Sequence, residues 1–329
     1  SASARDSGRD IKVIACLCMT ECADASSNPR MRTPSLATLA LLCLVGCDAP
    51  NPELSQTPPH ARNETIPLLQ WPDLLSRERP TTPHTIRTGP SGPHPVVIMV
   101  HGGCWQKSIA DRRLMDFAAE DLRQKGLAVW NIEYRGVDEA GGGYPGTFED
   151  VSRAADALRD HASQFNLKLD RIGAIGHSAG GHLALWLAAR PKLPKSSTLW
   201  RSNPLHIDFV VNSGGLADLD ASAPVTQAAC LNSIMEALTG TPSGARQDVL
   251  SDTSPVELLP FAAHQVSVNG EQDQIAPPIL GESYTDKAIA TGSDARFVLV
   301  PNTGHVELVA PGSEAFELQA AILLEALAD

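Results

Sequence analysis

One serine of the sequence stands in a setting that favours nucleophilic chemistry. Ser178 is the central residue of Gly176-His177-Ser178-Ala179-Gly180, a G-x-S-x-G pattern that links the apolar segment 171–175 to the apolar segment 179–189. This pattern predicts a strand that turns sharply into a helix, with the serine hydroxyl lifted above the sheet. Small neighbours allow the strained backbone, and the helix N-terminus stabilises negative charge that develops beside the hydroxyl. We therefore predict that Ser178 is a nucleophile.

A second motif offers donors for a negatively charged oxygen. His101-Gly102-Gly103-Cys104-Trp105 follows the apolar run 95–100, and its two glycines let the backbone turn N–H groups toward a pocket. The tetrahedral intermediate of acyl transfer needs such donors. We predict an oxyanion hole formed by the N–H groups of Gly103, Cys104 and Ala179. The imidazole of His101 is interpreted as a structural clamp within the loop.

A histidine and a carboxylate complete the expected site, because a serine nucleophile of this type is followed in the chain by an acid and then a histidine. Asp273 follows the expected strand 265–268, and His305 follows the expected strand 297–300. We predict that His305 is the general base and that Asp273 orients and stabilises its imidazole. The side chain of His177 is expected to form a wall, pointing away from the hydroxyl. Three other carboxylates remain alternatives for the acid: Glu271, Asp218 and Asp220.

The elements that must position these residues alternate along the chain. Apolar runs predict six strands, at residues 95–100, 128–134, 171–175, 209–212, 265–268 and 297–300. Helical spacing of apolar residues predicts helices at 111–125, 148–161, 179–189 and close to the end of the sequence. This alternation is typical of a mostly parallel sheet with helices on both faces. Residues 213–260 form the only stretch long enough for a small lid.

Composition excludes one class of partner. The 329 residues are 43% apolar and 19% charged, as in a globular enzyme, and carry a formal net charge of −12. A negative surface repels phosphate backbones, so we expect no nucleic acid partner. We also predict no cofactor and no metal ion.

Residues 1–47 predict an upstream extension and a lipoprotein signal peptide. Met31-Arg32 precedes an apolar run of about ten residues, too short to span a bilayer but typical of a secretion signal. The run ends in Leu44-Val45-Gly46-Cys47, which resembles a bacterial lipobox with Cys47 as the site of lipid attachment. An ordinary cleaved signal or an uncleaved tail is the alternative. Residues 48–80 predict a proline-rich tether, and residues 81–329 the folded domain.

The predicted anchor has two consequences. The membrane becomes a partner through the lipid, and the expected location is the bacterial cell envelope, facing the periplasm or the exterior. A lipidated Cys47 leaves two thiols in the mature chain, those of Cys104 and Cys230. Their pairing cannot be decided from the sequence, because it depends on the distance between their Cα atoms.

The two motifs together resemble a known family. His101-Gly102-Gly103-Cys104-Trp105 with Gly176-His177-Ser178-Ala179-Gly180-Gly181-His182 is similar to the esterase and kynurenine formamidase branch of the α/β-hydrolases. Three shorter segments resemble connecting segments of that branch: Tyr134-Arg135, Tyr144-Pro145 and Asp150. The related hormone-sensitive lipase group usually has a third glycine and an acidic residue where this sequence has Cys104 and His177.

This resemblance implies an α/β-hydrolase fold for residues 81–329, with a mostly parallel central sheet and helices on both faces. It implies hydrolysis of a small-molecule carboxylic ester through an acyl-enzyme on Ser178. An arylformamidase or a small-peptide hydrolase, whose leaving group is an amine, is the alternative enzyme. A surface binding module on a catalytically silent hydrolase fold is the alternative outside enzymes. Predicted export favours the carboxylesterase, because a secreted lipoprotein is an unusual setting for tryptophan breakdown.

Overall fold

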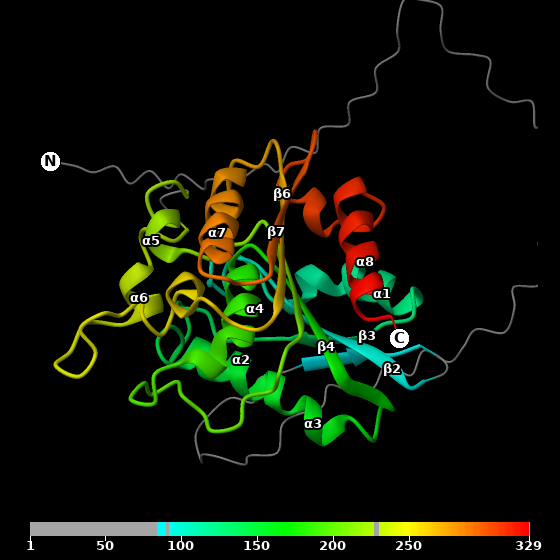
Figure 1. Ribbon diagram of the computed structural model, residues 1–329, viewed down its shortest axis with the longest axis horizontal. Helices are drawn as coiled ribbons and strands as arrows, with labels where there is room; N and C mark the ends of the chain where they lie inside the picture. The colour runs from blue at the N-terminus through cyan, green and yellow to red at the C-terminus, as the bar shows by residue number, and fades with distance from the viewer. Residues whose placement is uncertain (1–83, 90–91, 227–229, 329) are drawn as a thin grey trace, which may run out of the picture. The chain divides into compact units, whose positions relative to one another are not determined.

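A computed structural model describes residues 84–89, 92–226 and 230–328, and in these ranges seven strands form one sheet in the order β1-β3-β2-β4-β5-β6-β7 (Figure 1). The strands are β1 (His84–Arg87), β2 (His94–Val100), β3 (Ala128–Ile132), β4 (Leu167–His177), β5 (Phe209–Ser213), β6 (His264–Gly270) and β7 (Ala295–Val300). Only β1 runs antiparallel to its neighbour, β3, whereas all other neighbours are parallel. The predicted mostly parallel sheet is confirmed. Cys47, the predicted signal peptide and the whole predicted tether lie outside the described residues.

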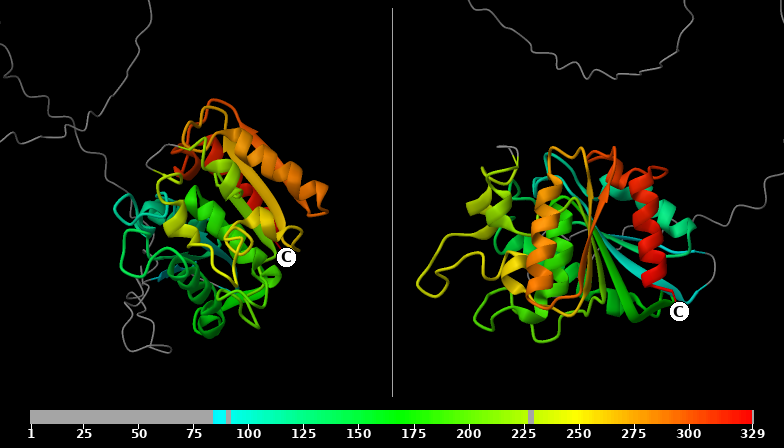
Figure 2. Two further views of the ribbon diagram at one scale, coloured as in Figure 1. Left: turned by 90° about the vertical axis from the view of Figure 1, so that its left-hand side faces the viewer. Right: turned by 45° about the horizontal axis from the view of Figure 1, so that its top comes forward.

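Helices cover both faces of the sheet (Figure 2). One face carries α2 (Gly146–Asp156), α3 (Leu158–His161), α4 (Ala179–Ala189) and α7 (Pro278–Ala290), and the other carries α1 (Asp116–Gln124) and α8 (Glu314–Ala326). Two short helices, α5 (Leu219–Ser222) and α6 (Met235–Thr239), lie in the segment between β5 and β6. Four 3₁₀ turns complete the described structure: η1 (Arg112–Met115), η2 (Arg190–Lys192), η3 (Pro255–Leu258) and η4 (Glu307–Val309). No helix in the described ranges is long and apolar enough to cross a membrane.

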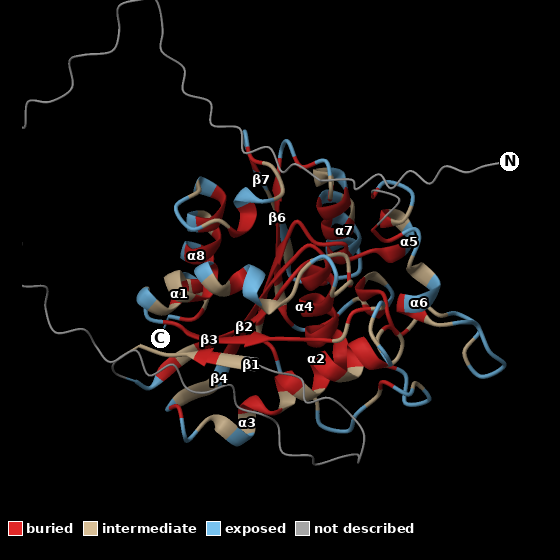
Figure 3. Cartoon of the chain, turned by 180° about the vertical axis from the view of Figure 1, so that it is seen from behind, coloured by how far each residue is buried: buried red, intermediate tan, exposed pale blue. Residues whose placement is uncertain are grey.

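The central strands are buried because their side chains pack into two apolar layers, one on each face of the sheet. In β2, Val96, Ile98 and Val100 pack into the layer under α2 and α4, whereas Val97 and Met99 pack into the layer under α1 and α8. This division explains why the strand is a continuous apolar run rather than an alternating one. Figure 3 shows the same burial for α4, in which every residue is buried. The carboxyl ends of the parallel strands are therefore held in place by two packed apolar layers.

The predicted helix at 111–125 differs from the structure in its phase. The spacing of the apolar residues in 111–125 predicts that Leu114, Phe117, Ala118 and Leu122 share the buried face, but Leu114 and Phe117 are 43% and 80% exposed. The buried face instead contains Met115 and Ala119, together with the two other predicted residues, Ala118 and Leu122. The segment begins as the 3₁₀ turn η1, whose three residues per turn rotate the face relative to an α-helix.

Candidate active site

A single residue makes the turn between β4 and α4. The strand ends at His177 and the helix begins at Ala179, so Ser178 alone reverses the chain, with φ 56° and ψ −121°. This backbone conformation costs a non-glycine residue about 1–3 kcal/mol, so the surrounding structure must hold it. The N–H of Ser178 donates a 2.9 Å hydrogen bond to the carbonyl of Ser213 at the end of β5. The predicted strand–turn–helix is present, and its strain is at the predicted serine.

Glycines on both sides of Ser178 allow the chain to pack this tightly. A Cβ atom on Gly176 would overlap the carbonyl of Gly180, and one on Gly180 would overlap the carbonyls of Val100 and His101. The turn therefore requires glycine at both positions, as the sequence pattern indicated.

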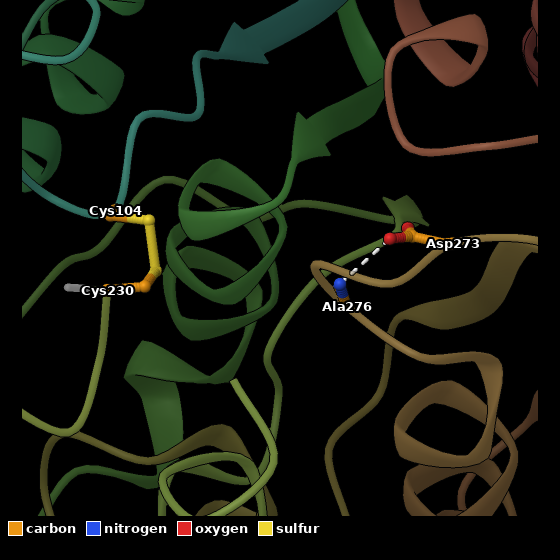
Figure 4. Close-up of a disulfide and its surroundings, with 4 residues drawn as sticks. All are labelled: Cys104, Cys230, Asp273 and Ala276. Atoms are coloured by element: carbon orange, nitrogen blue, oxygen red, sulfur yellow. Dashed lines mark hydrogen bonds between the residues drawn. A yellow bond between two sulfur atoms is a disulfide. The ribbon is translucent and has the colours of Figure 1, made fainter. Parts of the chain in front are cut away.

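The predicted base and acid are in direct contact. Nδ1 of His305 lies 2.6 Å from Oδ2 of Asp273, and both side chains are almost fully buried. The other carboxylate oxygen, Oδ1, accepts the N–H groups of Ile275 and Ala276 at 2.8 Å each. Figure 4 shows the bond from Ala276. Because the carboxylate only accepts, Nδ1 of the imidazole carries the proton, and Nε2 is left as the basic nitrogen.

The alternative acids have other partners. Oδ2 of Asp218 accepts a 2.6 Å hydrogen bond from Nζ of Lys287, and its Oδ1 caps α5. Oε2 of Glu271 accepts the N–H of Asn302 at 3.1 Å, and Asp220 is exposed. Among the carboxylates that the structure describes, Asp273 is therefore the one brought to the imidazole.

The serine turn and the acid–base pair meet at the carboxyl edge of the sheet. The ring of His177, which directly precedes Ser178, lies 4.4 Å from the ring of His305 between centroids. A Cβ atom on Gly214, just after β5, would lie 3.3 Å from Oδ2 of Asp273 and 3.4 Å from Cε1 of the imidazole. The loops after β4, β5, β6 and β7 thus converge on one place, as the expected parallel order requires.

The loop after β2 reaches the same place. Gly103, Cys104 and Trp105 all have positive φ, of 108°, 51° and 53°. A Cβ atom on Gly102 would lie 3.1 Å from Cβ of Ser178, so this loop packs against the serine turn. In the part of the chain that the structure describes, no backbone carbonyl accepts the N–H of Gly103 or Cys104. The assignment of these N–H groups, with that of Ala179, to an oxyanion hole stays a prediction.

His101 has the contacts of a clamp. Its Nε2 lies 2.7 Å from Oε1 of Glu133, its Nδ1 lies 2.7 Å from the carbonyl of Gly102, and its ring stacks on Tyr134 at 4.2 Å. Burial raises the pKa of the Glu133 carboxyl, but bonds from His101 and Lys107 outweigh burial and leave the pKa below its usual value. Within the described residues, no three side chains of the metal-binding types gather as a metal site requires.

The two thiols that sequence reasoning left undecided form a disulfide. Cys104 and Cys230 are 126 residues apart in sequence, and their Cα atoms lie 5.0 Å apart (Figure 4). A disulfide-bonded Cys104 is no thiol nucleophile. Because Cys230 belongs to the segment 213–260, the bond fastens the predicted lid to the loop that holds the proposed oxyanion donors.

His182 makes a second link between the same parts. Nε1 of Trp105 donates to Nδ1 of His182 at 3.2 Å, so Nε2 carries the proton and donates to the carbonyl of Thr253 at 2.8 Å. Burial lowers the pKa of the imidazole to about 4, which keeps it neutral near pH 7. These contacts make His182 a packing residue that joins the two segments.

Comparison with known proteins finds relatives that are named as esterases. It is 23% identical over 226 residues to the probable isoprenylcysteine alpha-carbonyl methylesterase ICMEL1 of Arabidopsis thaliana, covering 66% of this chain and 46% of that protein. It is 24% identical over 220 residues to esterase LipC of Mycobacterium tuberculosis, covering 66% of this chain and 54% of that protein. The chain thus spans about half the length of these curated relatives.

Solved structures share the fold. A truncated carbohydrate esterase from gut microbiota superposes with a TM-score of 0.60 at 21% identity, over 76% of this chain and 91% of that one. Esterase B from Lactobacillus Rhamnosis superposes with a TM-score of 0.63 at 18% identity, over 74% of this chain and 79% of that one. These likenesses and the sheet order confirm the α/β-hydrolase fold. The BD-FAE family model matches residues 86–287, more than half of the sequence, and the chain therefore belongs to the BD-FAE family.

Proposed function

We propose that this protein hydrolyses carboxylic esters through an acyl-enzyme on Ser178. The observation that carries the proposal is the 2.6 Å contact between Nδ1 of His305 and Oδ2 of Asp273, next to a serine in a strained strand–helix turn. Such strain costs stability, and it accumulates where a side chain must be held in one reactive position. The esterase names of the relatives and of the structural neighbours support the same reaction class.

The reaction follows from the roles of these groups. Oγ of Ser178 attacks the ester carbonyl carbon while Nε2 of His305 accepts the hydroxyl proton. The tetrahedral intermediate collapses, its bond to the alcohol oxygen breaks, and the imidazolium returns the proton to the leaving alcohol. Water then attacks the acyl-enzyme with the same assistance, which releases the acid and the free serine. Asp273 holds the Nδ1 tautomer and stabilises the imidazolium formed in each half-reaction.

Stabilisation of the oxyanion is assigned to backbone N–H groups. Gly103 and Cys104 supply two donors with no carbonyl acceptor in the described chain, and Ala179 supplies a third at the first residue of α4. The positive end of this helix adds a favourable potential for the negative oxygen. Loss of one such donor costs about 2.7–4 kcal/mol of transition-state stabilisation, so the conformation of this loop matters for the rate.

A fluorophosphonate probe and a substrate panel test the proposal. We expect the probe to label Ser178, as mapped by peptide mass spectrometry, and the variant Ser178→Ala to lose both labelling and turnover. Ser163→Ala, at an exposed position, serves as the matched control and should keep both. Retained hydrolysis of p-nitrophenyl acetate by folded Ser178→Ala contradicts the proposal. Faster turnover of N-formylkynurenine than of p-nitrophenyl butyrate assigns the protein to the arylformamidases instead.

We also propose that the protein is exported and anchored to a membrane of the bacterial envelope by a lipid on Cys47. The disulfide between Cys104 and Cys230 supports export, because disulfides persist in oxidising compartments. Mass spectrometry of the membrane fraction should find a lipidated N-terminus at Cys47, and Cys47→Ala should release the protein from that fraction. A soluble protein that retains an intact peptide around Met31 contradicts this proposal.

A further inference from the structure

His177 is a buried polar residue at the site with no role in the reaction as described. Its side chain lies among the loops that carry the nucleophile, the base and the oxyanion donors, yet none of the proton transfers uses it. We propose that His177 is a positioning residue that holds the general base by a hydrogen bond from its Nε2–H to the backbone carbonyl of His305. This proposal rests on the proposed function, in which His305 is that base.

The contact joins two distant parts of the chain. Nε2 of His177 lies 3.1 Å from the carbonyl oxygen of His305, 128 residues later in the sequence. The two rings also touch, with centroids 4.4 Å apart and planes inclined by 42°. Because His177 directly precedes Ser178, the bond connects the strand that carries the nucleophile to the loop that carries the base. It acts on the backbone of His305 and so fixes the point about which the imidazole rotates.

The contacts also determine the protonation of His177. A carbonyl oxygen only accepts, so Nε2 must carry the proton and Nδ1 must hold a lone pair. Nδ1 is buried without a hydrogen-bond partner in the described structure, and a Cβ atom on Gly102 would approach it to 2.9 Å. An unpartnered buried acceptor is unfavourable, and an apolar side chain would avoid it. The bond from Nε2 is therefore the contribution of this ring that an apolar residue could not replace.

The neutral state of this ring suits the charge changes of the reaction. Burial, together with the nearby His305, lowers the pKa of His177 to about 3, although the bond to the carbonyl of His305 and the Asp273 carboxylate oppose the shift. The titratable groups that act on this ring are thus His305 and Asp273. The hydroxyl of Ser178 belongs to the next residue in the chain. A neutral ring adds no repulsion when His305 becomes an imidazolium. It can therefore hold the base in both protonation states.

A matched pair of substitutions separates the hydrogen bond from the volume of the side chain. His177→Gln keeps an N–H donor at nearly the same reach, whereas His177→Met has a similar length and no donor. We expect kcat for p-nitrophenyl acetate to fall about 10- to 100-fold in His177→Met, because a misplaced base loses orientation. KM should change little, and His177→Gln should keep about tenfold more of kcat than His177→Met. Equal kcat in the two folded variants overturns the proposal.

A second measurement does not depend on turnover. In proton NMR of the full chain, Nδ1–H of His305 bonded to Asp273 should give a downfield resonance that Asp273→Asn removes. We expect this resonance to broaden or vanish in His177→Met and to persist in His177→Gln. An unchanged resonance in His177→Met overturns the proposal. If His177→Met does not fold, His177→Asn, whose amide is too short to reach the carbonyl, replaces it with the same expected results.

The two proposals fail in distinguishable ways. If Ser178→Ala retains esterase activity but the resonance responds as expected, the proposed function is wrong and the positioning of His305 by His177 stands. If Ser178→Ala is inactive but the Gln and Met variants behave alike in both measurements, the positioning role is wrong and the serine hydrolase stands.

Discussion

Removal of the disulfide should loosen the proposed oxyanion loop and lower stability. The bond between Cys104 and Cys230 closes a loop of 126 residues. For a loop of that length the chain-entropy model gives roughly 4.9 kcal/mol, and typical native disulfides contribute about 2–4 kcal/mol. In a domain of about 250 residues, 1 kcal/mol changes Tm by about 2–4 °C. We therefore expect Cys230→Ser to lower Tm by about 4–16 °C.

The same substitution should lower activity. Cys104 lies between Gly103 and Trp105, and all three residues hold positive φ angles in the loop proposed to stabilise the oxyanion. Full loss of one donor costs about 10²–10³ in kcat, so partial disorder of the loop should cost about tenfold. The decrease should appear in kcat rather than KM, because the donors act on charge that develops in the transition state.

Thermal unfolding followed by circular dichroism and kinetics with p-nitrophenyl acetate measure both effects. A phosphine reductant applied to the wild type should reproduce the phenotype of Cys230→Ser, and the double variant with Cys104→Ser should not respond to the reductant. A thiol count must confirm that the wild-type bond has been reduced. Wild-type Tm and kcat in the reduced protein would refute the reasoning that this bond holds the loop.

Three other substitutions test individual contacts of the site. Asp273→Asn should lower kcat about 10⁴-fold at unchanged Tm, because the wrong imidazole tautomer is then favoured; a decrease below tenfold in steady-state kinetics contradicts the assignment of the acid. The imidazole of His182 has a pKa of about 4 in the folded protein and about 6.5 in the unfolded chain. Because the unfolded chain therefore binds a proton first as the pH falls, the free energy of unfolding should decrease by roughly 3 kcal/mol between pH 6.5 and pH 4. His182→Gln should flatten this dependence in urea unfolding, and an unchanged pH slope contradicts it. Gly180→Ala should prevent soluble expression or lower Tm strongly, because its methyl group would overlap two carbonyls, and a wild-type Tm contradicts the described turn.

The strands that were predicted share one property, and the elements that were missed lack it. The predicted parts of β2 and β4, residues 95–100 and 172–175, are continuous apolar runs because their side chains fill the layers on both faces of the sheet. β1 (His84–Arg87) is a four-residue edge strand, and among its residues 85–87 only Ile86 is buried, so it has no apolar run to recognise. In α7 (Pro278–Ala290), exposed Ile279 and Ile289 blur the helical pattern, since apolar residues lie on both the buried and the open side.

The surroundings of Ser178 could be predicted from local sequence, whereas the choice of the acid could not. A strand, a turn of small residues and a helix occupy consecutive positions, so the sequence contains the whole local geometry around Ser178. Glu271 and Asp273 are only two residues apart in the loop after β6, and no local pattern decides between them. The choice depends on which carboxylate meets His305, and that residue comes from the next strand. The backbone N–H groups of Ile275 and Ala276 bind Asp273 and hold its other oxygen toward the imidazole.

The hydrogen-bond partner of His177 cannot be predicted from the motif that contains this residue. A turn made by one residue sends consecutive side chains in different directions, so it follows from the motif that His177 points away from the hydroxyl of Ser178. What lies on that side is set by β7 and the loop after it, which bring the carbonyl of His305 to 3.1 Å. The pairing of Cys104 with Cys230 depends in the same way on the course of a later segment. In both cases a side chain in a predicted motif has its partner in a loop whose path is decided by packing of the whole sheet, and only the folded chain reveals the contact.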